Sequence, residues 1–386
     1  MPTSTTKPRV LVVVRWPVGG IRTWCRYVYR HQAFSVFDID IVMPRDPEAE
    51  ALQQDLADTG IRTILLECGS STRAFALAAS KYMLGGRWAL IHSHGFTSGL
   101  VSAVPASAKR IPHLVTVHDV ILDGQYRDWR GRLARVLISR MLRSATCIHA
   151  VGEAAAENLR QAFPWIRRRP DQLRVIRNGI DTRRFLSAQP EEGLRERLGI
   201  AQDAILVGFF GRFMAQKGFR YLIDAVAAHR KASPTGRPLV VLAVGGGGFQ
   251  REEEHAVRTR GLAENFRFLD FSPDIASLIK SVDVVAMPSL WEACPLQPME
   301  VLTAGVPLVV SDCDACREVV ADSPAKVVPL RDAVALRQGL LEMSTPTQAS
   351  HANGFRRVAA ERFNVEATTV DIVGLYKSLN RLQCAC

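Results

Sequence analysis

Long apolar runs are missing from the sequence. The first apolar stretch, Val10 to Val14, has five residues and ends at Arg15, whereas a membrane-spanning helix needs about 20. No small-residue cleavage site follows it cleanly, so we interpret this stretch as a buried β-strand rather than a signal peptide. We therefore expect a cytoplasmic protein without a membrane-spanning segment.

Cysteine is also sparse. The eight cysteines are scattered over 386 residues, which excludes the short, disulfide-dense class of secreted proteins. Cys313 and Cys316 form a single C-x-x-C motif with no second pair, so reduced thiols are favoured over a zinc or redox site. The segment after the first apolar stretch, "RWPVGG", lacks the G-x-G-x-x-G pattern, which counts against a dinucleotide-dependent oxidoreductase.

The first half of the chain has few acidic residues relative to its basic ones. Residues 1–190 hold 27 Lys and Arg against 15 Asp and Glu, whereas residues 191–386 hold 22 against 23. This asymmetry indicates an anionic surface or substrate that meets the first half only. A nucleic acid is the weaker interpretation, because the sequence has no recognition motif and its aromatic residues are not arrayed for base stacking.

The sequence alternates continuous Val/Ile/Leu runs with longer amphipathic stretches. Such runs indicate strands buried on both faces, and strand–helix–strand repetition gives a parallel sheet covered by helices on both sides. The pattern turns polar around 187–200 and then begins again, so we predict two doubly wound α/β domains, 1–190 and 191–365. We expect helix throughout 355–382. The predicted strands lie in 9–14, 37–43, 61–66, 88–94, 113–119, 147–153, 173–179, 204–212, 237–248, 265–271, 282–289, 306–312 and 325–330.

Ligands of doubly wound sheets bind outside the carboxyl ends of the strands, so we expect the site in the cleft between the domains. The loop "GFFGRFMAQKGF" places Gly211, Arg212 and Lys217 at such a strand end. Two cations at the start of a helix suit a diphosphate, and a solvated surface loop is an equal alternative. The glycines 245–248 allow a tight turn close to a ligand or to a neighbouring loop.

The stretch "PSLWEACPLQPMEVLTAG" places Glu292 in a loop and Glu300 in the first turns of a helix that should end at Gly305. Ionised carboxylates only accept hydrogen bonds, so they suit the hydroxyls of a ribose and a sugar. Backbone amides near the helix start favour an anion. The alternative is one glutamate favoured by the helix dipole and one exposed glutamate. These amides belong to Cys294, Leu296 and Gln297.

Residues 125–143 form a basic amphipathic segment with interfacial aromatic residues, a form suited to a membrane surface. An ordinary surface helix is the commoner alternative. Two histidines, His92 and His94, end a predicted strand, where a role near an acceptor and a purely structural role are equally expected.

"GRFMAQKG" followed by "PSLWEACPLQPMEVLTAGVPLVVSD" resembles the retaining, nucleotide-sugar-dependent glycosyltransferases of the GT-B fold, the large group 1 or family four enzymes. Their mark is Glu, seven residues, Glu, and then a small-residue–Gly–x–Pro strand. "VIRNGIDTRRF" resembles the segment that ends their first domain, and the tail resembles their closing helices. The resemblance implies that residues 366–386 form a helix that packs back on the first domain.

Residue roles also follow from the resemblance. Glu300 would hold the ribose hydroxyls and Glu292 the hydroxyls of the donor sugar, whereas Arg212 and Lys217, beside Gly211, would bind the diphosphate. Gly19 and Gly20 would let the first domain close on the phosphates, and His118 would contact the sugar or its leaving group. The family pattern differs from this chain at Gly152, Asp270, Asp314 and Ala315, which affects the base pocket and acceptor contacts.

The implied activity is transfer of a sugar from a nucleoside diphosphate sugar to a glycan or lipid-linked acceptor with retention, in cell-surface polysaccharide or glycolipid synthesis. No cofactor or metal is implied. The D-x-D of Asp312 to Asp314 follows a buried strand, which is the wrong context for the metal-binding motif of other transferases. A non-catalytic nucleotide-sugar-binding protein of the same fold is the alternative. The donor base, the sugar and the acceptor stay open, and contact with an anionic membrane is expected from the basic first half.

Overall fold

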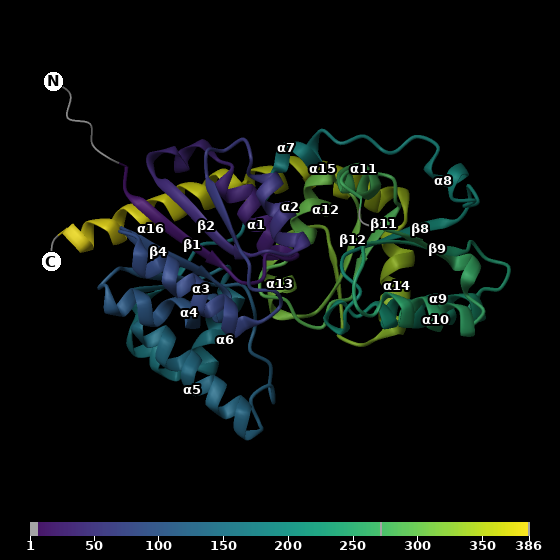
Figure 1. Cartoon of the computed structure of the whole chain (residues 1–386). Helices are drawn as coiled ribbons and strands as arrows, with labels where there is room; N and C mark the ends of the chain where they lie inside the picture. The colour runs from purple at the N-terminus through teal and green to yellow at the C-terminus, as the bar shows by residue number, and fades with distance from the viewer. Residues whose placement is uncertain (1–6, 271, 385–386) are drawn as a thin grey trace. The chain divides into compact units, whose positions relative to one another are not determined.

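The computed structural model describes residues 7–270 and 272–384. The chain divides into two compact units: unit 1 comprises Met1–Gly179 with Val365–Cys386, and unit 2 comprises Ile180–Asn364. Each unit is a parallel sheet with helices packed on it (Figure 1). The predicted boundary at residue 190 therefore lies inside unit 2, and the C-terminal helix is counted with unit 1.

Among the described residues, unit 1 holds a seven-stranded parallel sheet in the order β3-β2-β1-β4-β5-β6-β7. Each strand falls within one of the predicted segments except β2, which extends one residue past its predicted end to Pro44. The strands are β1 (Arg9–Val14), β2 (Asp38–Pro44), β3 (Arg62–Leu66), β4 (Leu90–His94), β5 (His113–Val117), β6 (Cys147–Ala150) and β7 (Leu173–Val175). The helices, with η for 3-10 helices, are α1 (Gly20–Tyr29), η1 (Gln32–Val36), α2 (Pro47–Asp55), α3 (Thr72–Gly85), α4 (Gly95–Ala108), α5 (Trp129–Ser144), α6 (Glu153–Ala162), η2 (Pro164–Arg168), η3 (Pro170–Gln172) and α16 (Val365–Cys384).

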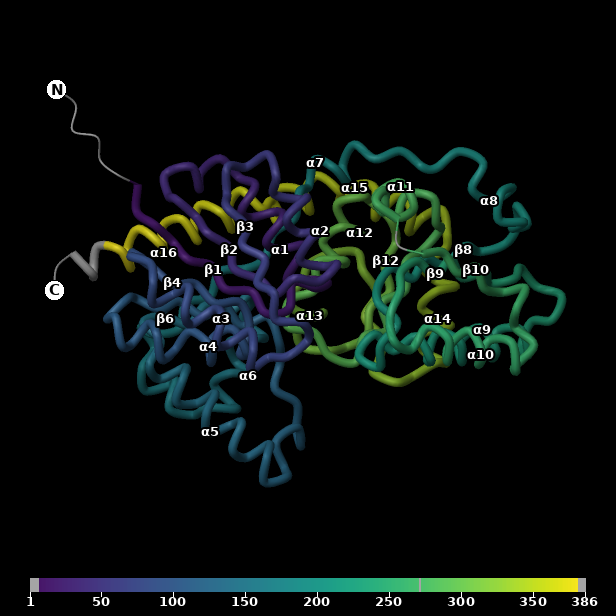
Figure 2. Tube along the Cα trace, viewed as in Figure 1, coloured from purple at the N-terminus to yellow at the C-terminus, as the bar shows by residue number. Residues whose placement is uncertain are grey.

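The central strands of unit 1 are buried on both sides because helices cover both faces. Leu11 and Val13 of β1 pack with Phe75 of α3 in one core cluster. Successive side chains of a strand point to opposite faces, so the next residues along meet the other layer, which contains α1 and α16. Tyr29 of α1 and Tyr376 of α16 are fully buried there. Figures 1 and 2 show α16, the yellow C-terminal helix, running along this layer.

Unit 2 holds, within the described residues, a six-stranded parallel sheet in the order β10-β9-β8-β11-β12-β13. These strands also fall within predicted segments. They are β8 (Ile205–Phe210), β9 (Leu239–Val244), β10 (Phe266–Leu269), β11 (Val284–Met287), β12 (Leu308–Ser311) and β13 (Lys326–Val328). The helices are α7 (Thr182–Leu186), α8 (Leu194–Arg197), η4 (Ala215–Lys217), α9 (Phe219–Ala232), α10 (Gln250–Thr259), η5 (Ala263–Asn265), α11 (Ile275–Lys280), α12 (Gln297–Ala304), α13 (Asp314–Val320), α14 (Ala333–Met343) and α15 (Pro346–Arg362).

The helix predicted over 355–382 is wrong as one continuous element, because the chain breaks it at Phe363 and Asn364. Phe363 N–H closes α15 on Ala359, and its carbonyl accepts a 2.8 Å hydrogen bond from Ile180 N–H. Asn364 forms a parallel bridge with Ile180. These backbone bonds to another segment replace the bonds that would carry α15 into α16.

In each sheet the strand order reverses once, between β1 and β4 in unit 1 and between β8 and β11 in unit 2. Loops that leave such a pair of strands at their carboxyl ends separate to opposite faces, and the space between them is where ligands of doubly wound sheets bind. No helix within the described residues is both long enough and apolar enough to cross a membrane.

Candidate donor site and the family of the chain

The loop after β8 lies directly against the carboxyl end of β11. Gly218 directly precedes α9 with a φ of 64°, and a Cβ atom added to it would stand 2.1 Å from the carbonyl oxygen of Pro288. Leu290 N–H donates a 2.7 Å hydrogen bond to the carbonyl of Gln216. Glycine is therefore required at 218 both for the left-handed backbone and for this close approach.

Two of the predicted site residues form an ion pair across these loops. Nζ of Lys217 lies 2.7 Å from Oε1 of Glu292, and the two side chains are only 21% and 10% exposed. The carbon Cε of Lys217 passes 3.9 Å from where a Cβ on Gly211 would stand. The loop after β8 thus presents its ammonium group to the carboxylate of the loop after β11.

Gln216 is a site residue that the sequence interpretation missed. Its amide nitrogen donates to the carbonyl of Trp291 at 2.8 Å and to Oε2 of Glu292 at 3.2 Å. The Glu292 carboxylate is therefore held by one donor on each oxygen. The signal was present in the sequence, because Gln216 directly precedes Lys217 in "MAQKG".

The helix α12 begins as predicted at a proline-containing turn. Pro298 stands in its first turn, Leu296 precedes it, and Gly305 ends it with a φ of 73°. Glu300 lies half-buried in the first turn, and its N–H donates to the carbonyl of Leu296 at 3.0 Å. Cys294 and Leu296 are half-buried beside it.

Polar groups near this helix start have unused hydrogen-bonding capacity. The hydroxyl of Ser289, in the loop after β11, and the amide nitrogen of Gln297 are buried without a partner among the described residues. Arg212 is exposed and forms no hydrogen bond or ion pair with the described part of the chain. An anion with adjoining hydroxyl groups would supply acceptors for such donors.

The glycines 245–248 serve the neighbouring loop. A Cβ on Gly245 would stand 2.2 Å from the carbonyl oxygen of Gly211, and a Cβ on Gly247 would stand 2.6 Å from that of Phe213. Phe213 N–H donates to the carbonyl of Gly246 at 2.9 Å. Close approach to an adjacent loop, one of the two predicted uses of this turn, is therefore confirmed.

Cys313 and Cys316 are buried free thiols at the start of α13. The hydrogen bond from Cys316 lowers the pKa of Cys313, and the same hydrogen bond followed by burial raises the pKa of Cys316 well above its usual range. Within residues 7–270 and 272–384, no group of three or more His, Cys, Asp or Glu side chains is placed to hold a metal ion.

The predicted site residues of unit 1 lie at the carboxyl edge of its sheet. Gly19, with a φ of 53°, precedes α1, and Gly20 is its first residue. His118 directly follows β5 and is half-buried. Trp24 of α1 joins the two places, because its ring lies 5.8 Å from that of His118. The residues of the loops after β8 and β11 belong to unit 2, which we describe by itself.

His118 is held by a buried chain of hydrogen bonds. Its Nε2 lies 2.9 Å from Nδ1 of His94, and the two rings are stacked. His94 Nε2 lies 3.0 Å from the hydroxyl of Tyr29, which contacts the hydroxyl of Tyr376 at 3.1 Å. The C-terminal helix is thereby connected to the histidine at the sheet edge.

A second series of hydrogen bonds leads from Ile176 to Tyr376, and its first bond fixes the histidine tautomers along it. Nε2 of His149 lies 2.9 Å from the carbonyl of Ile176; a carbonyl only accepts, so this nitrogen carries the proton. His149 Nδ1 then accepts from the Thr116 hydroxyl at 2.9 Å. Thr116 in turn accepts from Nε2 of His92 at 2.6 Å, which leaves His92 Nδ1 to accept from Tyr376 at 2.6 Å. These assignments require neutral imidazoles.

Burial favours the neutral form of these histidines. It lowers the pKa of His118 to about 3, with a further contribution from His149, and lowers the pKa of His113 and of His149 to about 4. Burial and the neighbouring histidines lower the pKa of His92 and His94 well below the usual range. Desolvation of a cation is the common cause.

The segment predicted as a basic amphipathic helix over 125–143 is helical only from Trp129. The prediction is therefore wrong for residues 125–128. Asp128 caps α5 by accepting from Gly131 N–H at 2.8 Å. Trp129 and Leu133 are 68% and 52% exposed, and Val136 and Leu137 are also exposed. The arginines of this surface form no ion pair with the described residues; they are Arg127, Arg130, Arg132, Arg135, Arg140 and Arg143.

Comparison with known families follows the two units. Residues 204–345 match the family described as glycosyl transferases group 1, and residues 19–179 match a glycosyl transferase 4-like domain. The chain belongs to the glycosyltransferases, with a 4-like domain in unit 1 and a group 1 domain in unit 2. The sheet order and the helices of each unit are those of the GT-B fold, as the resemblance implied.

Individual proteins similar to this glycosyltransferase are named for different activities. It is 28% identical over 252 residues to the α-maltose-1-phosphate synthase of Mycolicibacterium smegmatis, covering 60% of this chain and 62% of that protein. It is also 28% identical over 215 residues to the lipopolysaccharide core biosynthesis mannosyltransferase LpsB of Rhizobium meliloti, covering 54% and 61%. The match thus spans about three fifths of each relative.

A solved structure supports the fold over nearly the whole chain. HepE of Anabaena, crystallised with UDP-glucose, superimposes with a TM-score of 0.80 at 21% identity and covers 96% of this glycosyltransferase and 99% of HepE. At this identity the likeness defines the fold, and the substrate of this chain is a separate question.

Proposed function

We propose that this glycosyltransferase moves a sugar from a nucleoside diphosphate sugar to a glycan or lipid-linked acceptor with retention of the anomeric configuration. One observation carries the proposal: the loops after β8 and β11 meet through Lys217 and Glu292 at the point where the strand order reverses. A cation and a carboxylate fixed at that edge match a ligand with both phosphate and hydroxyl groups. The UDP-glucose bound by HepE supports the same class of donor.

In this proposal, unit 2 supplies the charge that receives the leaving group. Arg212 and Lys217 bind the diphosphate and stabilise its negative charge as the glycosidic bond breaks. Arg212 has no competing partner among the described residues, so no internal ion pair has to break when it binds. Lys217 exchanges part of its contact with Glu292 for a phosphate oxygen.

The carboxylates orient the donor. Glu300 accepts hydrogen bonds from the ribose hydroxyls, and Glu292 accepts them from the sugar once Lys217 turns to the phosphate. The amides near Cys294, Leu296 and Gln297, at the start of α12, favour the same anion. Holding the reacting groups in one orientation is the larger part of such catalysis, because the leaving diphosphate itself takes the acceptor proton on the same face.

The part of the proposal that concerns unit 1 assigns backbone approach to the phosphates to Gly19 and Gly20. His118 contacts the sugar or its leaving group. The neutral state of His118, favoured by burial, makes it a hydrogen-bonding group rather than a fixed charge. We also propose that the reaction needs no metal ion, since the two cations of unit 2 fill that role.

A donor screen tests the proposal. The purified chain is melted with UDP-, GDP- and ADP-sugars, and a ligand at about 100 times its dissociation constant should stabilise it by about 2.7 kcal/mol. The sugar that shifts the melt is then incubated with acceptors, and NMR identifies the anomer formed. Turnover in the presence of EDTA tests metal independence.

Two outcomes would contradict the proposal in different ways. Binding of a nucleotide sugar without transfer or hydrolysis would favour a non-catalytic nucleotide-sugar-binding protein of the same fold. An inverted product would overturn retention while leaving the donor site intact.

We further propose a cytoplasmic protein that meets a lipid-linked acceptor at an anionic membrane surface, in polysaccharide or glycolipid synthesis. The proposed membrane contact rests on the exposed surface of α5. It combines exposed Trp129 and Leu133 with the unpaired arginines named above, and aromatic residues with basic neighbours favour the interface of anionic lipids. The named role of LpsB in lipopolysaccharide core biosynthesis supports this acceptor class.

Vesicle sedimentation tests the membrane contact. Binding to vesicles with anionic lipid should fall with salt and should weaken in Trp129→Ser. Leu77→Ser is the matched control, because Leu77 is an exposed apolar residue of α3 in the same unit. Equal binding by both variants, or binding that does not depend on salt, would contradict the assignment of α5.

A further inference from the structure

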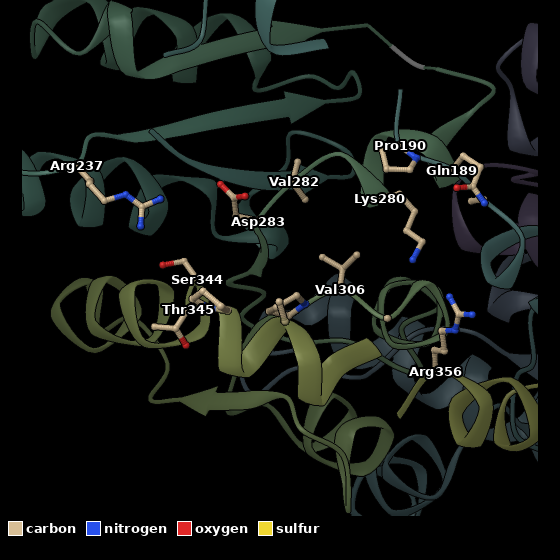
Figure 3. Close-up of a pocket in the computed structure, with 15 residues that line it drawn as sticks. Gln189, Pro190, Arg237, Lys280, Val282, Asp283, Val306, Ser344, Thr345 and Arg356 are labelled. Atoms are coloured by element: carbon tan, nitrogen blue, oxygen red, sulfur yellow. The ribbon is translucent and has the colours of Figure 1, made fainter. Parts of the chain in front are cut away.

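A pocket in unit 2 lies at the opposite ends of the strands from the proposed donor site. It has a volume of about 480 Å³ and is drawn in Figure 3. Asp283 directly precedes β11, and Pro307 directly precedes β12. The pocket is therefore at the amino ends of these strands, whereas the loops of Lys217 and Glu292 leave the carboxyl ends.

Two cations of this pocket face each other. Figure 3 shows the ammonium group of Lys280 and the guanidinium group of Arg356 pointing toward one another. Neither side chain forms a hydrogen bond or ion pair with the described residues, although both are half-buried. Burial, and next the charge of Arg356, lowers the pKa of Lys280. Partly buried like charges without a counter-charge are unfavourable unless an anion joins them.

The acidic side chains nearby are already engaged. Asp283 lines the pocket, but its carboxylate binds Arg195 at 2.8 Å and accepts a 2.7 Å hydrogen bond from Leu206 N–H. Glu191, whose backbone N–H bonds Ser281 next to Lys280, pairs with Arg197. The positive charge of Lys280 and Arg356 is thus left for a ligand.

The stem of Arg356 packs against the chain. A Cβ built on Gly305 would lie 3.3 Å from its Cβ and 3.4 Å from its Cδ, so its stem lies along the residue that ends α12. A planar guanidinium held this way can bind two oxygens of one phosphate, which a mobile surface arginine does at a higher entropy cost.

The other residues that line the pocket indicate what else the ligand contains besides a phosphate group. Val282, Val306 and Pro307 form an apolar middle, and Arg237 stands at the far end, where its Nε donates to the carbonyl of Asp203. The pocket is larger than a bare phosphate needs and has a second polar end. A phosphate attached to a small polar carbon skeleton matches this arrangement.

We propose that this pocket binds a small phosphorylated metabolite of sugar-phosphate size, with its phosphoryl group between Lys280 and Arg356. This site is separate from the proposed donor site and does not depend on it. Bound phosphate would replace the mutual repulsion of the two cations by charge-assisted hydrogen bonds.

Calorimetry with inorganic phosphate and with glucose 6-phosphate tests the site on the full chain. Arg356→Gln and Lys280→Gln should each weaken binding of glucose 6-phosphate by about tenfold or more, the loss of one charge-assisted hydrogen bond. Lys231→Gln is the matched control, since Lys231 is an exposed cation of the same unit outside the pocket. Arg212→Gln is the second control and reports on phosphate bound at the proposed donor site. Circular dichroism confirms that each variant is folded.

Tighter binding of glucose 6-phosphate than of inorganic phosphate, lost in the two pocket variants only, is the expected result. Equal affinity for the two probes would overturn the organic part of the ligand and leave free phosphate. Binding that is lost in Arg212→Gln and kept in Arg356→Gln would overturn the pocket, as would no saturable binding of either probe.

Discussion

Lys217 and Glu292 form an ion pair in which Nζ of the lysine lies 2.7 Å from Oε1 of the glutamate, and both side chains are largely buried. One comes from the loop after β8 and the other from the loop after β11, 75 residues away in sequence. The pair holds an ammonium group and a carboxylate in a defined orientation at one sheet edge before a donor arrives. Each residue therefore influences both the stability of the loops and the proposed chemistry.

Lys217→Met should lower kcat more than it weakens donor binding. If Lys217 mainly stabilises charge that develops on the leaving diphosphate, its loss acts on the transition state, by about 100-fold for one such donor. Steady-state kinetics with the donor found in the melt screen measure kcat, and calorimetry measures donor affinity. Equal, mild changes in both quantities would contradict this role.

The same variant should also destabilise unit 2. Removing the ammonium leaves a largely buried carboxylate without its ion-pair partner, at a cost of about 3 kcal/mol. Glu292→Gln in the Lys217→Met background should recover part of that loss, because the amide carries no charge to bury. Urea denaturation of the wild type, both single variants and the double variant gives the coupling energy. Additive effects would show that the pair contributes nothing to stability.

Glu300→Ala should weaken nucleotide-sugar binding by about 1.5–3 kcal/mol, the contribution of a hydrogen bond to a charged acceptor. The turnover of bound donor should change less, because the ribose lies away from the bond that breaks. Calorimetry measures the affinity. Glu361→Ala is the control, since Glu361 is an exposed glutamate of α15. Unchanged affinity in Glu300→Ala would remove Glu300 from the donor site.

The four glycines 245–248 should differ in their tolerance of alanine. Gly245→Ala should destabilise the chain, because its φ is 141° and the new Cβ would stand 2.2 Å from the carbonyl of Gly211. Gly248→Ala should be neutral, since nothing lies within 4 Å of the added atom. Thermal melts compare the two variants with the wild type. Equal melting temperatures would mean that the loops after β8 and β9 do not approach this closely.

The strands were predictable because local sequence decides them. A run such as "RVLVVV" is apolar at every position, and only a strand covered on both faces buries all of them. The end of α12 at Gly305 was equally local, since a glycine in the left-handed conformation is the usual way to end a helix. Family motifs then located Glu292 and Glu300.

What could not be predicted depends on contacts between distant segments. The break between α15 and α16 arises from backbone bonds to Ile180, which no pattern near Phe363 encodes. The pairing of Lys217 with Glu292, the role of Gln216 and the link from Tyr376 to His92 also join residues far apart in sequence. The start of α5 at Trp129 was missed because the basic, aromatic pattern extends past the capping residue Asp128.

Acidification from pH 6.5 toward pH 5 should destabilise unit 1. The pKa of His113 and of His149 lies near 4, and that of His118 near 3, in the folded chain, against about 6.5 when unfolded. Between these pH values the histidines are protonated in the unfolded chain and neutral in the folded chain, so the free energy of unfolding falls as pH decreases. Each such histidine contributes up to about 1.4 kcal/mol per pH unit.

Urea denaturation at pH 7.5, 6.5, 5.5 and 5.0 measures this dependence above the range where most carboxylates titrate. His149→Gln should reduce the slope by the contribution of one histidine, because an amide can still donate to Ile176 and accept from Thr116 but cannot take up a proton. His255→Gln is the matched control, since His255 is exposed and lies outside the histidine cluster of unit 1. Two results would contradict this prediction: a free energy of unfolding that does not change between pH 6.5 and 5.0, or the same pH dependence in His149→Gln as in the wild type. Either would mean that these histidines take up protons in the folded state as well. That result would also remove the ground for treating His118 as neutral during the proposed transfer.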